Sequence, residues 1–463
     1  MFIITRPALC CSEIDYTLKV VFSDWLGIDY KIKTGVLQEI QIYGNDKTLN
    51  IPVTFFEKAS KLWLNEETLP VLPLKSLSHN ELPSSISRFL FPSSDNIPVL
   101  YGQPTIMLFL NQIVCSVDLI GGIFFMLSRY EEVVINERDK HDRFPAKSSI
   151  AVKENFYDRP IANEYLQLLW GMMKTLWPNI ERKQRSFKIH PSHDIDKPFE
   201  DFYRPPHLML QRFAGDVLKR KKINVAIENY KRWHNVRKGE YHTDRFFSFD
   251  FIMSESEKRN LKSTFFFLPS GSPEQKICIG ATNPFLINKM KDISTRGHEI
   301  GIHGHYLTYL NKNEYIRETE KLRNILNTNG ISQELKGGRQ HYLRVNIPET
   351  FRIWEAANLE YDSTIGFSDR PGFRCGTCYE YQLYDVINRK ALNIKEKPLV
   401  VMEGTIIYKH NMGKGYSADA FNIFKKFKDI CRFYRGDFTL LWHNNEFVKR
   451  EQRDLYCSVL DSE

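Results

Sequence analysis

The chain has 463 residues and a formal net charge of +8, with 42% hydrophobic and 26% charged residues. This composition is typical of a globular protein with a sizeable core and excludes a largely disordered chain. Because a single hydrophobic core seldom grows beyond about 250–300 residues, we expect two domains. The modest charge lacks the long basic stripe of a nucleic-acid-binding protein, so no nucleic acid is expected as a partner.

The cysteines and the N-terminus bear on the cellular compartment. Eight cysteines are scattered along the chain and do not form the dense framework of small secreted domains. Cys375 and Cys378 lack the second pair that a structural zinc site needs, so buried thiols are expected there. Residues 1–5 form an apolar stretch that ends at Arg6, too short for a secretory signal. We therefore expect a cytoplasmic protein.

Residues 1–185 are predicted to form an α+β domain. Apolar runs bounded by Pro, Asn and Gly predict short strands, and the clearest helical pattern spans residues 163–176. The strands are expected at 18–22, 40–43, 99–101 and 106–110. The most apolar stretch, 105–127, contains Asn111 and Asp118, which are costly in a bilayer, so it predicts a strand and a core helix and no membrane span.

Two charged features of the sequence have a structural explanation, and the first of them also has a functional one. The basic runs 182–185 and 219–222 are most simply solvated helix faces, and the alternative is attraction of an anionic sugar derivative or lipid-linked phosphate. The charged segment 139–145 has no evident purpose, and a salt-bridged surface or a domain interface explains it best. The polar segment 179–185 is a plausible linker to a second domain.

A βα alternation begins at Ser186 and continues to the C-terminus. Strands are expected at 187–190, 263–268, 299–303, 399–402 and 438–442, and helices at 314–328, 349–357 and 418–434. This alternation predicts a parallel sheet or barrel, in which catalytic groups collect at the carboxyl ends of the strands. The expected domains are therefore an α+β domain of residues 1–185 and an α/β domain of residues 186–463.

Aspartate and histidine residues follow several of these strands. Asp194 and Asp196 end the first strand, His303 ends the third, and Arg339 and His341 come one helix later. His443 ends the last strand. Carboxylates and imidazoles at separate strand ends can converge on one divalent cation, which is the requirement for metal-assisted hydrolysis.

Residues 186–450 resemble the polysaccharide deacetylases of carbohydrate esterase family 4, the NodB-homology domain. The resemblance rests on the order Asp194 and Asp196, His298–His303, Arg339, His443. It implies a distorted (β/α) barrel and removal of acetyl groups from an N-acetylated sugar with the help of a divalent metal, most simply zinc. The whole chain further resembles a bacterial subgroup that joins an uncharacterised N-terminal domain to this barrel and is encoded among surface-polysaccharide genes.

The sequence departs from the family pattern at two places. Ile195 separates the two aspartates, although in a strand that spacing still puts both on one face. Where the family has its second metal histidine, this chain has Leu307, which cannot ligate. We expect His341 to supply the missing ligand beside Asp196 and His303, and His305 is the alternative.

The resemblance also implies roles for the remaining residues. Asp194 would accept a proton from the attacking water, and His443 would protonate the departing amine. Arg339 or Arg374 would orient Asp194, although structural salt bridges explain arginines equally well. Tyr306 and Trp442 are candidate platforms for a sugar ring, and His298 is expected to be structural.

The expected substrate is an N-acetylated sugar, an oligosaccharide or a glycan precursor. Two other functions are compatible with the sequence. The loss of the family histidine at Leu307 also suits a non-catalytic barrel that binds glycan or an assembly partner. A hydrolase of an ester or glycosidic bond is the second alternative, and a glycosidase would need two carboxylates flanking the sugar without a metal.

Overall fold

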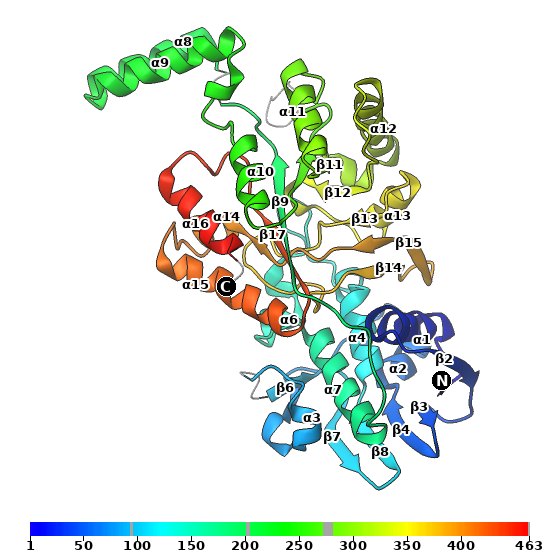
Figure 1. The fold of residues 1–463 in the computed structure, drawn as a ribbon. Coiled ribbons are helices and arrows are strands. Elements are labelled where there is room, and N and C mark those ends of the chain that lie inside the picture. Colours follow the sequence, from blue (N-terminus) through cyan, green and yellow to red (C-terminus); the bar gives the residue numbers. More distant parts are fainter. Residues whose placement is uncertain (93–95, 201–203, 272–280, 462–463) are drawn as a thin grey trace. The chain divides into compact units, whose positions relative to one another are not determined.

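The computed structural model describes residues 1–92, 96–200, 204–271 and 281–461 (Figure 1). The chain divides into two compact units that each combine separate segments of the sequence. The first unit comprises Met1–Lys188, Tyr342–Val401 and Lys426–Phe438, and the second comprises Ile189–His341, Met402–Lys425 and Thr439–Glu463. The boundary after residue 185 that the sequence suggests stays a prediction.

The first unit contains a mixed six-stranded sheet with the order β2-β1-β3-β4-β8-β7. Its strands are β1 Phe2–Arg6, β2 Tyr30–Thr34, β3 Glu39–Gly44, β4 Lys47–Pro52, β7 Gly102–Leu108 and β8 Gln112–Val117. Ile40 and Ile42 are buried on one face of β3, as the alternating sequence predicts. Asn45 and Asp46, both with positive φ, form the two-residue turn to antiparallel β4. A two-stranded sheet pairs β5 Lys75–Ser78 with β6 Asn96–Val99.

The first segment of this unit also contains several helices. They include α1 Cys11–Leu18, the π-helix η1 Lys19–Leu26, α2 Thr54–Leu62, α3 Ser84–Ser87, α4 Leu119–Leu127, α5 Tyr130–Val134, α6 Ile150–Lys153 and α7 Ile161–Leu176. The helix predicted at 163–176 is confirmed as α7. The strand predicted at 18–22 is wrong, because this stretch is helical and its apolar side chains are all buried. Burial overrides the strand preference of its valines.

The apolar stretch 105–127 forms a strand, a turn, a second strand and the helix α4. Every residue of α4 is buried, which is why the helix is apolar on all sides. Asp118 caps the helix by accepting a hydrogen bond from the Gly121 amide at 2.7 Å, and it also accepts one from the Phe55 amide at 2.8 Å. Among the described residues, no helix is both long and apolar enough to cross a bilayer.

The remaining segments of the first unit come from later in the chain. They contain α13 Glu349–Ala356, β13 Tyr361–Asp362, β14 Tyr381–Asp385 and β15 Lys390–Glu396. β15 pairs with β13 in parallel and with β14 antiparallel. Cys375 and Cys378 are buried free thiols, as expected.

The second unit is built on parallel strands in the order β12-β11-β10-β9, with β17 beside β9. The strands are β9 Lys188–Ile195, β10 Thr264–Phe267, β11 Glu299–Gly304, β12 Gly337–Gln340 and β17 Asp437–Leu441. The helices of this unit include α10 Phe249–Glu257, α11 Pro284–Thr295, α12 Lys312–Thr328, α14 Glu403–Ile407 and α16 Arg450–Leu460, and α15 Ala418–Phe433 begins in this unit and ends in the first. The α/β class is confirmed, with a curled, half-barrel arrangement of parallel strands after the mixed sheet.

Two glycines let the central parallel strands approach closely. A Cβ atom at Gly338 would lie 1.9 Å from the Ile302 carbonyl oxygen, and one at Gly301 would lie 2.5 Å from the Phe266 ring. Glycine at both positions therefore allows β11 to fit between its neighbours. The parallel register pairs Asp194 with Phe266 and His303 with Arg339, so the carboxyl ends of these strands come to one edge.

Candidate metal centre

Two aspartates stand at the carboxyl end of β9. Asp194 is the penultimate residue of the strand and is buried, whereas Asp196 follows the strand and is partly buried. Because side chains alternate along a strand, residues two apart share a face. Both carboxylates accordingly approach the same histidine, His303, at 3.7 Å from Asp194 Oδ2 and 3.1 Å from Asp196 Oδ1. The interruption by Ile195 leaves the aspartate pair intact.

His303 is held in one orientation by the neighbouring strand. Its Nδ1 lies 2.9 Å from the Arg339 carbonyl oxygen, which can only accept a hydrogen bond. Nδ1 therefore carries a proton, and Nε2 faces Asp196, where it can bind a cation once it has lost its own proton. Metal-binding histidines are commonly oriented in this way by a carbonyl or carboxylate behind the ring.

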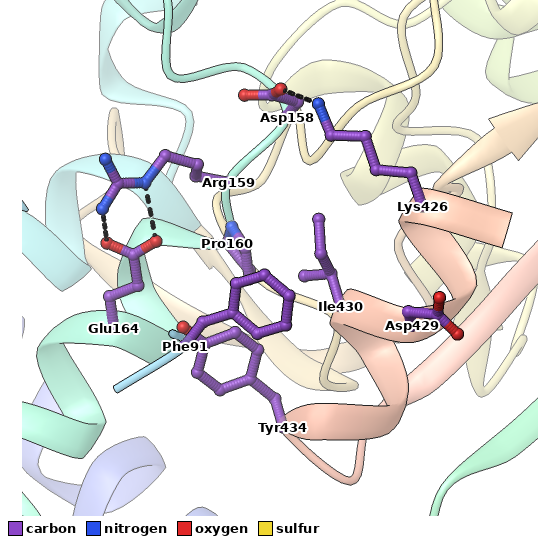
Figure 2. Close-up of a pocket in the computed structure, with 9 residues that line it drawn as sticks. All are labelled: Phe91, Asp158, Arg159, Pro160, Glu164, Lys426, Asp429, Ile430 and Tyr434. Carbon is purple, nitrogen blue, oxygen red and sulfur yellow. Dashed lines mark hydrogen bonds and ion pairs between the residues drawn. The ribbon is translucent and has the colours of Figure 1, made fainter. Parts of the chain in front are cut away.

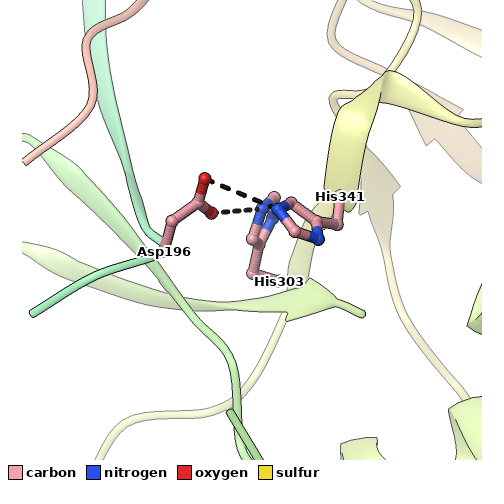
Figure 3. Close-up of side chains that lie close together, drawn as sticks. All are labelled: Asp196, His303 and His341. Atoms are coloured by element: carbon pink, nitrogen blue, oxygen red, sulfur yellow. Dashed lines mark ion pairs between the residues drawn. The ribbon is translucent and has the colours of Figure 1, made fainter. Parts of the chain in front are cut away.

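His341 completes a cluster with Asp196 and His303, which we call the metal centre (Figure 3). Its Nε2 lies 3.5 Å from Asp196 Oδ2, and the two imidazole rings are 5.1 Å apart between centroids. One potential ligand atom from each of the three residues lies within 4.8 Å of the others. Ligand atoms this close together could bind one cation, for which ligand distances of about 2.0–2.2 Å are usual.

The hydrogen bonding of the metal centre supports a cation there. Asp196 Oδ1 and His303 Nε2 are buried and face each other at 3.1 Å, but within the described residues neither atom makes a well-aligned hydrogen bond. Buried polar atoms are rarely left in this condition unless they bind something. Burial alone would raise the pKa of Asp196, but His341 and His303 lower it well below its usual value. Asp196 is thus kept ionised, as a metal ligand must be.

Asp194 and Arg339 form a buried ion pair next to the metal centre. Arg339 Nη1 donates to Asp194 Oδ1 at 2.9 Å and to Ser192 Oγ at 3.0 Å. The guanidinium lies over the Phe266 ring at 4.8 Å. These contacts fix the Asp194 carboxylate with its second oxygen toward His303. Arg339 therefore occupies the orienting position that the sequence left open between two arginines.

His443 approaches the metal centre from the end of β17. Its Nε2 lies 3.8 Å from Asp196 Oδ2, while its Nδ1 lies 2.5 Å from Glu403 Oε1. Glu403 begins α14 and is fully buried. Burial lowers the pKa of His443, but the Glu403 carboxylate outweighs it and raises the pKa to about 10. Sequence reasoning missed Glu403, because a single glutamate at a helix start carries no motif.

The His443–Glu403 pair predicts a pH-dependent stability. A histidine whose folded pKa is about 10 rather than 6.5 stabilises the fold fully below about pH 6.5, and this contribution is lost as the pH rises through 10. We expect Glu403→Gln to lower the His443 pKa from about 10, because the carboxylate that raises it is removed, and NMR titration of chelator-treated protein measures this. The thermal stability of wild type should exceed that of the variant most below pH 6.5. An unchanged His443 titration would contradict this assignment.

The positions of Leu307, His305 and His298 bear on which residues could bind the metal. Leu307, at the family's second histidine position, is 59% exposed. His305 Nε2 lies 3.4 Å from Glu314 Oε1, so its ring is directed to α12. The structure groups His341, and not His305, with Asp196 and His303. His298 is buried and accepts a hydrogen bond from the Ser263 amide at 3.0 Å, consistent with a structural residue.

The structure assigns other contacts to two residues that the sequence suggested for the site. Arg374 donates to both carboxylate oxygens of Glu132, at 2.9 and 2.6 Å, so its guanidinium is committed to that pair. Trp442 has no exposed surface and packs against Phe424 and Tyr456. A buried indole cannot stack on a sugar, so both expectations are corrected. Tyr306, partly exposed after β11, stays a prediction as a sugar platform.

The charged segment 139–145 packs against the turn that follows His341. Arg143 is paired with Asp139 at 2.7 Å and donates to the Tyr342 carbonyl oxygen at 3.0 Å. Arg344 donates to the His141 carbonyl oxygen at 2.7 Å. Tyr342 has a φ of 62°, a conformation that such tertiary contacts hold in place. Within the first unit, the segment thus helps to hold the backbone of Tyr342 in this conformation.

A separate pocket of about 540 Å³ lies within the first unit (Figure 2). Figure 2 shows Arg159 paired with Glu164 and Lys426 paired with Asp158. The aromatic rings of Phe91 and Tyr434 also line the pocket. These ion pairs already engage the side chains of Arg159 and Lys426. We assign it no role in the function.

Comparisons with known proteins give one family match and one structural match. Residues 2–178 match a family of unknown function, DUF7033. This agrees with the expected uncharacterised N-terminal domain. A crystal structure described as that of a "putative polysaccharide deacetylase from Mycobacterium smegmatis" is similar to 62% of this chain and 87% of its own, with a TM-score of 0.36 and 15% sequence identity. None of the curated proteins matches the chain. Function is therefore inferred from the side chains of the metal centre.

Proposed function

We propose that this chain is a metal-dependent hydrolase that removes N-acetyl groups from a sugar or glycan precursor. The observation that carries the proposal is the convergence of Asp196, His303 and His341 from separate segments, with ligand atoms within 4.8 Å of one another. A two-histidine, one-carboxylate set is a common way to hold a catalytic zinc ion and keep positions open for water and substrate. The resemblance to the deacetylase family supplies the class of reaction.

The residues around the metal centre suit hydrolysis of an amide. A cation bound there would polarise the acetyl carbonyl and lower the pKa of water. Asp194, paired with Arg339 at 2.9 Å, is placed to accept the proton of the attacking water. His443 carries a proton at neutral pH because Glu403 raises its pKa, and it can donate that proton to the departing amine nitrogen. The candidate acid lies beside the metal centre, with His443 Nε2 3.8 Å from Asp196 Oδ2.

The substrate class follows from the same chemistry. An N-acetylated sugar, oligosaccharide or glycan precursor has the amide that this set of groups can cleave. Because similar proteins are encoded among surface-polysaccharide genes, we place the reaction in surface-polysaccharide metabolism. Tyr306, which follows β11, is the aromatic residue best placed in sequence to contact the sugar. The precise sugar would be set by residues around the open positions of the cation.

Acetate release from N-acetylated sugars tests the proposal. We expect purified protein loaded with zinc to release acetate, and chelator treatment to reduce the rate by more than about a hundredfold. Re-addition of zinc should restore the rate, which controls for irreversible damage by the chelator. If metal-loaded protein binds glycan without releasing acetate from any N-acetylated sugar tested, the alternative of a non-catalytic binding module, suggested by Leu307, replaces the hydrolase.

A further inference from the structure

A helical hairpin of the second unit is not used by the metal centre. Its helices are α8 Pro206–Ala214, extended by the π-helical turn η5 Gly215–Lys219, and α9 Ile223–Arg237. Trp233 Nε1, near the end of α9, donates to the Arg204 carbonyl oxygen before α8 at 2.8 Å, so the two helices run antiparallel. Figure 1 shows the hairpin extending away from the parallel strands of its own unit.

The hairpin concentrates the positive charge of the chain. Residues 206–238 contain nine Lys and Arg against two Asp and Glu, a net charge of +7, whereas the whole chain has +8. Asp216 is already bonded to Arg220 at 2.6 Å. In the described part of the chain, no carboxylate lies within ion-pair distance of Lys219, Lys221 or Lys222. These ammonium groups at the hairpin tip are available to an external anion.

Large apolar side chains near these charges are exposed to solvent. Leu218 and Ile223, which flank the basic run at the tip, are 78% and 57% exposed. Leu210 on α8 is 64% exposed, and Val225 and Ile227 on α9 are also exposed. Apolar residues of a surface helix ordinarily face the core, so a group of exposed ones marks a surface that contacts something else.

We propose that the α8–α9 hairpin docks on the surface of an anionic lipid bilayer. Leucine and isoleucine at the tip would enter the boundary between headgroups and acyl chains, while the lysine ammonium groups reach the lipid phosphates. Each basic side chain near such a surface contributes substantially to binding. The hairpin lies on the surface in this arrangement and does not span the bilayer.

The combination of positive charge and exposed apolar side chains favours an anionic bilayer over a nucleic acid or a second copy of the chain. A nucleic acid would satisfy the lysines but leave Leu218 and Ile223 in water. A second copy of the chain would bring two hairpins of +7 charge together, which like-charge repulsion opposes. An anionic bilayer satisfies both the charged and the apolar side chains.

Sedimentation of the full chain with lipid vesicles tests the proposal. We expect binding to vesicles that contain phosphatidylglycerol, little binding to pure phosphatidylcholine vesicles, and release at high salt. Lys219→Glu/Lys221→Glu/Lys222→Glu should weaken binding by more than about a hundredfold, since each charge near the surface is worth about fivefold. Leu218→Ser/Ile223→Ser should weaken it by roughly tenfold or more.

Matched variants control for charge and apolar exposure elsewhere. Lys31→Glu/Lys33→Glu, on the exposed strand β2, and Leu110→Ser, at a residue 94% exposed, should bind vesicles like wild type. His303→Ala should also bind like wild type, which separates this proposal from the proposed function. Equal binding of the hairpin variants, or no vesicle binding by wild type, would overturn it. Dimerisation or oligonucleotide binding that depends on Leu218 and Ile223, without vesicle binding, would assign the hairpin to that partner instead.

Discussion

Asp194→Asn is expected to lower the turnover rate for acetate release by about 10²–10⁴-fold while leaving the bound metal in place. Asparagine has nearly the shape of aspartate but cannot accept a proton at neutral pH. Arg339 Nη1 would still donate to the side-chain oxygen, so the local structure should survive. The ligand atoms of Asp196, His303 and His341 are unchanged by this substitution. Steady-state kinetics and metal content of the same preparation provide the measurement.

Arg339→Lys serves as the companion variant for this prediction. It keeps the positive charge but loses the fixed geometry that joins Asp194 to Ser192, so a smaller loss of rate is expected. If Asp194→Asn retained the wild-type rate with its metal bound, Asp194 would not be the base. If it lost the metal, Asp194 would have to be counted among the ligands.

Glu132→Ala is expected to destabilise the first unit by about 3–5 kcal/mol. Glu132 is buried and accepts hydrogen bonds from Arg129 and from Arg374. Burial would raise the pKa of Glu132, but the two guanidinium groups overcome it and hold the pKa at about 2. Removing this carboxylate leaves two buried cations with one remaining anionic partner, Glu131, which is bonded to Arg129.

Chemical denaturation of Glu132→Ala beside Glu67→Ala measures this effect. Glu67 is exposed in the same unit, and its substitution should change the free energy of unfolding by less than about 0.5 kcal/mol. Glu132→Gln, which keeps the size and one acceptor, extends the test if Glu132→Ala does not fold. An unfolding free energy of Glu132→Gln within 0.5 kcal/mol of wild type would mean that the buried cluster contributes nothing.

The parallel strands and the candidate ligands could be predicted from the sequence because they depend on local patterns. Strand-like runs ending in Asp, His or Arg put those side chains at one edge whatever the details of the fold. His341 could be preferred over His305 from the same rule, since it follows its own strand. The structure agrees with that grouping.

Contacts between residues that are far apart in the sequence could not be predicted, because they depend on how the whole chain packs. Arg374 lies 242 residues from Glu132 in sequence, and nothing in either neighbourhood indicates the pair. Glu403 and His443 are likewise joined only by folding. The buried helical run 18–22 and the buried ring of Trp442 show the same limit, because a local apolar pattern does not reveal which surface it will face.

Metal content of the purified protein tests the central claim most directly. We expect about one zinc ion per wild-type chain by elemental analysis, and loss of that zinc in Asp196→Ala, His303→Ala and His341→Ala, each with at least a hundredfold weaker binding. His305→Ala, which removes a buried histidine bonded to Glu314, should keep its zinc. Wild-type protein that binds no metal under zinc-replete conditions, or a His341→Ala variant that binds it as tightly as wild type, would contradict the proposed metal centre.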